Sequence, residues 1–153
     1  MPSASPVSDI TAHLGFWLRM VSNHVSHAFA QKVAGEGVTV AEWCLMRTLY
    51  GKEPTPPSRL ADEMGMTRGA ITRLADRLIA KSLIVREASA VDGRAQTLAL
   101  TAEGSGLVPG LAALADRNDE AFFGGLSAGE RETLERLLKR MAENGRMTAT
   151  PTG

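Results

Sequence analysis

Three arginines, Arg68, Arg73 and Arg77, lie close together in a chain whose formal net charge is zero. A guanidinium group can donate two hydrogen bonds to O6 and N7 of one guanine, or it can contact a phosphate. With ~100° between successive residues, a helix over residues 67–81 places Arg73, Arg77 and Gly69 on one side, opposite an apolar face. Small residues between arginines allow a helix to enter a DNA major groove. The pattern predicts a DNA-reading helix, although an ordinary amphipathic helix with a solvated arginine face would show the same residues.

The preceding segment indicates that this helix is the second half of a helix-turn-helix. Pro56 suits the first position of a short helix, Thr55 precedes it as a cap, and Gly65 ends that helix. Thr67 then starts the arginine-bearing helix. Its inner face carries four apolar residues that we expect to pack on the short helix: Ile71, Leu74, Ala75 and Leu78.

A β-hairpin is predicted directly after the arginine-bearing helix. Residues 82–88 and 96–101 are typical of strands, and the Asp92-Gly93 pair between them is typical of a hairpin turn. Arg94 follows the turn, where an arginine on a thin loop can enter a DNA minor groove. It could also pair with Asp92 and hold the turn, and the two roles are compatible. Residues 55–100 carry a net charge of only +2, so the placement of the arginines carries the argument rather than their number.

Amphipathic helices are predicted on both sides of this central region. The first begins at Asp9 and ends near Gly35, and a capping box of Thr39 and Glu42 opens a second helix that reaches about Tyr50. After Thr101 the apolar spacing is helical again. Its leucines are Leu107, Leu111 and Leu114, with Pro109 either tolerated near the helix start or kinking it.

A second capping box, Ser127 with Glu130, opens the last helix, whose apolar face carries Leu134, Leu137, Leu138 and Met141. The predicted order is four helices, a hairpin and two helices. This order is mainly α with a small β-hairpin wing, the layout of a winged helix-turn-helix.

Composition limits the remaining classes of protein. The chain has 153 residues with 17 basic and 17 acidic side chains, so any basic surface must be local. No stretch is long and apolar enough to span a bilayer, and the first residues are not typical of a secretory signal. The single cysteine, Cys44, cannot form an internal disulfide, and we expect a cytoplasmic setting. No persuasive catalytic triad or carboxylate pair is present, so we expect no enzyme activity and no cofactor.

Three connected runs resemble the multiple-antibiotic-resistance regulator (MarR) family of bacterial winged-helix transcription factors. They are "PSRLADEMGMTRGAITRLADRLIAKSLIVRE", "DGRAQTLALTAEG" and "LSAGERETLERLL". The resemblance extends over about residues 14–141. It implies a homodimer with interlocking N- and C-terminal dimerisation helices, bound to double-stranded DNA at a pseudo-palindromic operator. Ala95 and Gln96 stand where many members carry further arginines, which predicts a weaker wing contact.

The resemblance also divides the chain into functional parts. We expect a disordered segment at 1–8, a dimerisation region at 9–36 and 101–144, a DNA-binding lobe at 38–100 and a flexible tail at 145–153. The recognition helix would contact DNA, with the wing adding Asp92, Gly93 and Arg94. The DNA-binding residues are expected to be Thr67, Arg68, Gly69, Thr72, Arg73, Arg77 and Arg94.

In this family small aromatic acids often bind between the dimerisation region and the DNA-binding lobe. An aromatic wall, an imidazole and a guanidinium could hold an anionic phenol there. The candidate set is Trp17, His24, His27, Trp43 and Arg47, although core packing is the more common role of buried tryptophans.

Three other sites are weaker hypotheses. His24 and His27, with His13 nearby, could ligate a metal, but no full ligand set is evident and we expect no metal site. Cys44 could sense oxidants, although an isolated cysteine in an apolar run usually packs in a core. The run "GSGLVPG" at 104–110 departs from the dinucleotide-binding pattern in its spacing.

The sequence therefore predicts a dimeric, sequence-specific transcriptional regulator, a repressor released by a small aromatic effector. Two alternatives stay open. The regulator could act without a ligand, under redox control or its own concentration, or the winged helix could bind a protein partner.

Overall fold

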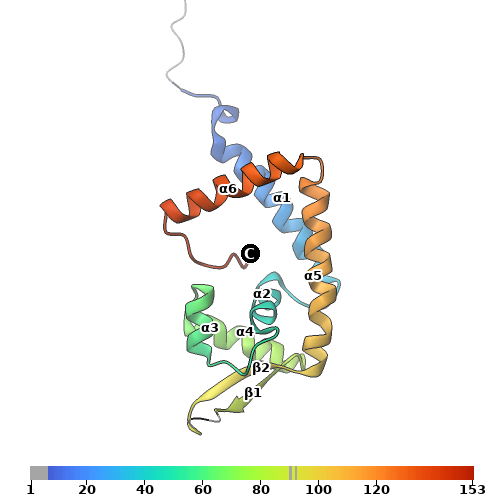
Figure 1. The fold of residues 1–153 in the computed structure, drawn as a ribbon, viewed down its shortest axis with the longest axis vertical. Helices are drawn as coiled ribbons and strands as arrows, with labels where there is room; N and C mark the ends of the chain where they lie inside the picture. The colour runs from blue at the N-terminus through green and yellow to red at the C-terminus, as the bar shows by residue number, and fades with distance from the viewer. Residues whose placement is uncertain (1–6, 90, 92) are drawn as a thin grey trace, which may run out of the picture.

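The structure is a computed structural model that describes residues 7–89, 91 and 93–153. Within them there are six α-helices and one antiparallel hairpin, which lies at one end of the molecule (Figure 1). The helices are α1 (Leu14–Ala34), α2 (Val40–Leu49), α3 (Pro57–Met64), α4 (Arg68–Ala80), α5 (Ala102–Phe123) and α6 (Ala128–Asn144), and the strands are β1 (Ile84–Ala88) and β2 (Gln96–Leu100). This order confirms the predicted mainly α fold with a β-hairpin wing. None of the described helices is long and apolar enough to cross a membrane.

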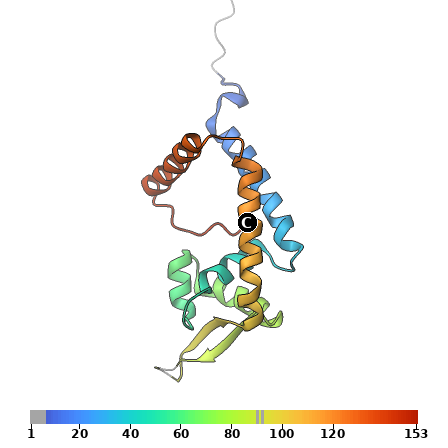
Figure 2. The same ribbon diagram turned by 45° about the vertical axis from the view of Figure 1, so that its right-hand side comes forward.

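The molecule is elongated, and α5 runs along most of its length (Figure 1). At one end, α1 and α6 lie near the start and finish of the chain. At the other end, α2, α3 and α4 gather above the hairpin (Figures 1 and 2). Helix α5 packs against both α1 and α2, so it joins the two ends.

The core lies where α2, α3, α4 and the hairpin meet. The four residues predicted for the inner face of α4 are all buried there: Ile71, Leu74, Ala75 and Leu78. Their buried neighbours include Leu45 of α2, Leu60 of α3 and Leu98 of β2. Burying one such side chain contributes about 1.5–3 kcal/mol, so this cluster holds the outward face of α4 in a fixed orientation.

Two predicted helix starts are wrong. Thr55 does not cap α3, because Pro56 occupies the cap position and Pro57 begins the helix. The backbone of Thr55 instead exchanges hydrogen bonds with Leu98 of β2 at 2.9 and 2.8 Å. This isolated antiparallel bridge attaches the segment before α3 to the hairpin.

The first long helix starts at Leu14 rather than Asp9. A 3₁₀ turn, η1 (Ile10–Ala12), comes first, and His13 is extended between the two. The indole Nε1 of Trp17 donates to the carbonyl oxygen of Thr11 at 2.9 Å, and His13 N donates to that of Ile10. Because the backbone of His13 is extended, it interrupts the helical path, and η1 and α1 stay separate.

The glycine-rich run at 104–110 lies inside α5 and has a packing role at its start. A Cβ on Gly104 would lie 2.1 Å from the carbonyl oxygen of Leu83, so only glycine allows α5 to approach the chain before β1 so closely. Helix α5 continues through Pro109 to Phe123.

Candidate nucleic-acid interface

The turn before helix α4 requires one residue with a left-handed backbone conformation. Gly65 has φ 62° and ψ 36° at the end of α3, where a glycine carries no steric cost. Thr67 then caps α4, and its Oγ1 accepts a hydrogen bond from Ala70 N at 3.1 Å. These local contacts set the angle between the two helices and leave the first turn of α4 facing solvent.

The exposed face of α4 combines small side chains with guanidinium groups. Thr67, Arg68, Gly69, Thr72 and Arg73 are all exposed. A Cβ on Gly69 would lie 3.6 Å from a terminal nitrogen of Arg73, so the guanidinium extends along the surface that Gly69 leaves open. The hydroxyl of Thr72 donates to the carbonyl of Arg68 at 2.9 Å. The face therefore carries small side chains around an exposed guanidinium group, an arrangement that suits a helix lying in a major groove.

Arg77 has a different environment from Arg73. Its Nε lies 3.9 Å from Oε2 of Glu42, a carboxylate whose side chain is fully buried. Glu42 Oε1 accepts hydrogen bonds from Thr39 N and from Nζ of Lys81, both at 2.8 Å. Lys81 also donates to the carbonyl of Gly37 at 2.9 Å. Two cations of α4 thus converge on one carboxylate at the start of α2.

The balance of forces keeps Glu42 ionised. Burial alone would raise the pKa of its carboxyl group, but the hydrogen bonds from Lys81 and Thr39 and the charge of Lys81 bring that pKa below its ordinary value. Glu42 Oε2 is buried and has no hydrogen-bond partner, so it can attract Arg77. Sequence reasoning identified Glu42 only as a cap, because its contact with Lys81 joins residues 39 positions apart.

The wing is joined to α4 by an ion pair that the sequence analysis did not anticipate. Arg86 of β1 lies 2.8 Å from the carboxylate of Asp76, which is on the outer face of α4. Beyond the strands, Ser89 N donates to the carbonyl of Ala95 at 2.8 Å. Gly93 and Arg94 lie exposed in the loop between Ser89 and Ala95, whereas Asp92 falls outside the described residues.

The structure separates the five residues proposed to bind an effector. Only Trp43 of these five lines a pocket of about 330 Å³ between α1, α2 and α5. There the ring of Phe29 packs edge-to-face on the ring of Trp43, with 6.5 Å between the ring centroids. His24 and His27 line a neighbouring hollow on α1. Trp17 contacts Phe16 near the start of α1, and Arg47 lies over the ring of Tyr50.

Other residues of this pocket were missed by sequence reasoning. Cys44 lines this pocket, and burial raises the pKa of the Cys44 thiol. A smaller fraction of the thiol is therefore present as the reactive thiolate at neutral pH. Asn118 lines it too and is nearly fully buried, with its amide donating to the Val25 carbonyl at 3.1 Å and accepting from Lys32 Nζ at 2.9 Å. Among the described residues, no group of histidine, cysteine and carboxylate side chains could hold a metal ion.

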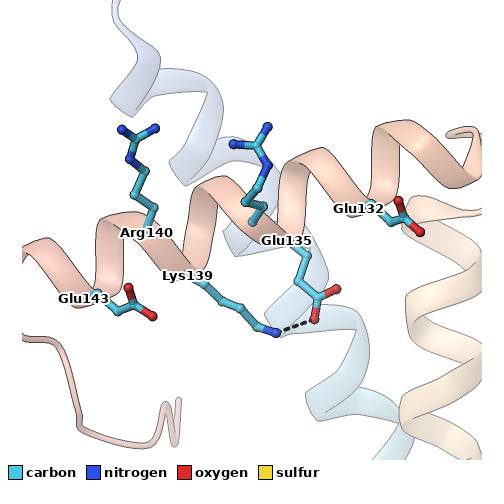
Figure 3. A pocket seen from close by; sticks show the side chains of 6 residues that line it. Glu132, Glu135, Lys139, Arg140 and Glu143 are labelled. Atoms are coloured by element: carbon cyan, nitrogen blue, oxygen red, sulfur yellow. Dashed lines mark ion pairs between the residues drawn. The ribbon is translucent and has the colours of Figure 1, made fainter.

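A third hollow, on α6, is a charged helix surface. It is lined by Glu132, Glu135, Arg136, Lys139, Arg140 and Glu143, all from this one helix (Figure 3). Glu135 and Lys139 form an ion pair of 3.0 Å at an i,i+4 spacing, with both side chains exposed. Such pairs contribute about 0.3–0.5 kcal/mol and are typical of a solvated helix face.

Comparison with known proteins supports a nucleic-acid-binding role for this fold. A sequence model of the MarR family matches residues 36–95. A protein of Thauera aromatica, described as a transcriptional regulatory protein for the hcr operon, is 32% identical over 134 residues, which are 87% of this chain and 81% of that protein.

Solved structures share the fold. A variant of Escherichia coli MarR complexed with operator DNA is 25% identical, with a TM-score of 0.75 over 84% of this chain and 92% of that chain. Bordetella bronchiseptica BpsR, whose structure concerns regulation of its DNA binding by 6-hydroxynicotinic acid, has a TM-score of 0.77 at 21% identity, over 89% and 97% of the two chains.

Proposed function

The chain belongs to the MarR family of DNA-binding transcriptional regulators, and from that premise we propose that it is a homodimeric repressor released by a small aromatic acid. The observation that supports this proposal best is the exposed face of the first two turns of α4, where Thr67, Gly69 and Thr72 leave room around Arg68 and Arg73. The target is a pseudo-palindromic operator on cytoplasmic DNA.

The proposed contacts divide by role. Arg73 reads a base edge in the major groove, and Arg68 contacts a phosphate near the helix start, where the backbone N–H groups also favour an anion. Gly93 and Arg94 bring the wing to the adjacent minor groove. Arg77 is held beside Glu42 and contributes charge near the DNA backbone rather than base recognition.

Homodimerisation is supported by apolar surface at the α1 and α6 end. Leu14 is 87% exposed, and Trp17, Leu18, Leu138 and Met141 are each at least 43% exposed. No described residue of α6 is buried. Large apolar side chains exposed in this number on α1 and α6 favour an interface, so we assign 9–36 and 101–144 to dimerisation and 38–100 to DNA binding.

An effector would bind in the pocket beside Trp43 and Phe29. The pocket lies between the α1 and α5 helices and α2 of the DNA-binding lobe, and its wall is mostly apolar, with Ser26, Asn118 and the carboxylate of Asp119 as polar groups. A BpsR structure concerns regulation by an aromatic acid, 6-hydroxynicotinic acid, which favours the same ligand class here. A ligand that prefers one spacing of the two recognition helices would shift the population away from the operator-bound form.

The test is a fluorescence-anisotropy titration against DNA from upstream of the protein's own gene, with a scrambled duplex as control and two salt concentrations. We expect tight, salt-sensitive binding to the first duplex and release by an aromatic acid. Equal weak binding to both duplexes at every salt concentration would show that this upstream DNA holds no operator for the protein, and selective binding that no aromatic acid changes would contradict the effector.

A further inference from the structure

Residues 147–153, called the tail below, turn back from α6 toward the DNA-binding lobe (Figures 1 and 2). Met147 N donates to the carbonyl of Ala142 at 2.8 Å, and Arg146 N donates to that of Glu143 at 3.1 Å. These two bonds form a Schellman motif, with Arg146 in the left-handed position at φ 52°. The reversal is therefore set by the end of α6 itself.

The tail packs on the turn of the helix-turn-helix. Thr150 N donates to the carbonyl of Met64, the last residue of α3, at 2.8 Å. A Cβ on Gly65 would lie 2.8 Å from Cα of Ala149 and 3.0 Å from the carbonyl oxygen of Thr148. Gly65 therefore serves two needs, because its missing side chain permits both the left-handed turn and the approach of the tail.

The end of the tail reaches the pocket between α1, α2 and α5. Pro151 and Gly153 form part of the pocket wall, opposite Phe29 and Trp43. The thiol of Cys44 donates to the carbonyl of Pro151 at 3.5 Å. The tail thus contacts both the Met64–Gly65 turn and the wall of the pocket.

We propose that the tail is an internal lid: it docks on the Met64–Gly65 turn of its own chain and closes the pocket beside Cys44. The ligand part of this inference rests on the proposed function: an aromatic acid that enters past Pro151 and Gly153, which form part of the pocket wall, would displace the tail. Displacement would also release a tether between α6, in the dimerisation region, and the helix-turn-helix. The lid would thereby link pocket occupancy to the freedom of the recognition helix.

The reaction rate of Cys44 with the thiol reagent DTNB tests docking without an operator or an effector, since the chain has one cysteine. Four proteins are compared: the full chain, a chain ending at Arg146, full-length Gly65→Asn, and both changes together. Asparagine tolerates a left-handed backbone but adds the Cβ that would meet Ala149. Gly51→Asn is the matched control, because Gly51 has φ 75° and open space around it.

We expect labelling to be about tenfold faster in the shortened chain and in Gly65→Asn, with no further increase when the changes are combined. Gly51→Asn should match the full chain, and circular dichroism should show equal helix content in all proteins. Equal rates in the full and shortened chains would overturn the lid. An effect of Gly65→Asn that persisted in the shortened chain would show that it acts through strain in the turn and not through the tail.

A second arm uses benzoate as a simple aromatic carboxylate, followed by calorimetry. Tighter binding by the shortened chain would support displacement of the tail, and equal measurable binding would overturn it. If labelling rates differed as expected but neither chain bound benzoate or related aromatic acids, the docked tail would stand and the effector part of the proposed function would fail.

Discussion

Arg73 and Arg77 lie one turn apart on α4, yet their surroundings predict different roles for them in DNA binding. Arg73 lies along the open surface beside Gly69, whereas Arg77 leans toward the buried carboxylate of Glu42. Arg73→Ala should therefore cost about 1–3 kcal/mol of operator binding and relax specificity at one base pair. Arg77→Ala should weaken binding similarly on matched and mismatched sites. Titrations against single-base operator variants would measure both effects. If Arg73→Ala bound each duplex with the same affinity as the unmodified protein, base reading by Arg73 would be contradicted.

Glu42 joins α2 to α4 through its hydrogen bond with Lys81, and its depressed pKa makes this link dependent on pH. The ionised form is favoured in the folded protein, so the contribution is complete above the ordinary pKa of 4.5 and is lost as pH falls through the lower folded value. Glu42→Gln should reduce the free energy of unfolding by about 1–3 kcal/mol at pH 7, since Gln cannot replace the charge.

Urea unfolding between pH 7 and pH 3 would measure this effect. The gap between Glu42→Gln and the unmodified protein should shrink toward the acid end. Glu130→Gln is the matched control, because Glu130 occupies the same capping-box position on the exposed α6 and has no lysine partner. A gap that stayed constant over the whole pH range would show that Glu42 acts only as a cap.

At the scale of elements, the wing is a thin hairpin that is held by the buried side chain of Leu98 and also by the ion pair of Arg86 with Asp76 of α4. If Arg94 contacts DNA phosphates or the minor groove, Arg94→Ala should weaken binding about evenly across sequences and reduce the salt slope by about 1. Arg140→Ala, on the charged face of α6, serves as the control for loss of one positive charge (Figure 3). Salt-dependent anisotropy would decide, and an unchanged slope for Arg94→Ala would exclude the wing contact.

Elements governed by local chemistry were predictable from the sequence, and contacts between distant residues were not. Both capping boxes, the left-handed Gly65 and the buried face of α4 follow from spacings of a few residues. The β-bridge between Thr55 and Leu98 could not be predicted, because the sequence pattern of a hairpin does not indicate pairing with a segment before α3. Trp17 and Trp43 were grouped by residue type, but α1 is long enough to separate Trp17 from the pocket at its other end.

At the scale of the whole molecule, affinity for a two-fold operator depends on joining two lobes. The apolar surface of α1 and α6 has no cover within the described chain, and Leu138 is 43% exposed there. In a homodimer that surface would be buried, so Leu138→Glu would place a charge in an apolar interface at a cost of several kcal/mol. The folded subunit should tolerate the change because the side chain already meets solvent.

We therefore expect Leu138→Glu to be a folded monomer by light scattering, with operator affinity reduced at least about a hundredfold, since the second lobe would no longer bind intramolecularly. Arg140→Glu adds the same side chain two residues along, on the face lined by Glu143 and Arg136, and should remain dimeric. A Leu138→Glu protein that stayed dimeric with full affinity would place the interface elsewhere. Monomers with full affinity would show that a single lobe suffices, which would remove the reason for two half-sites.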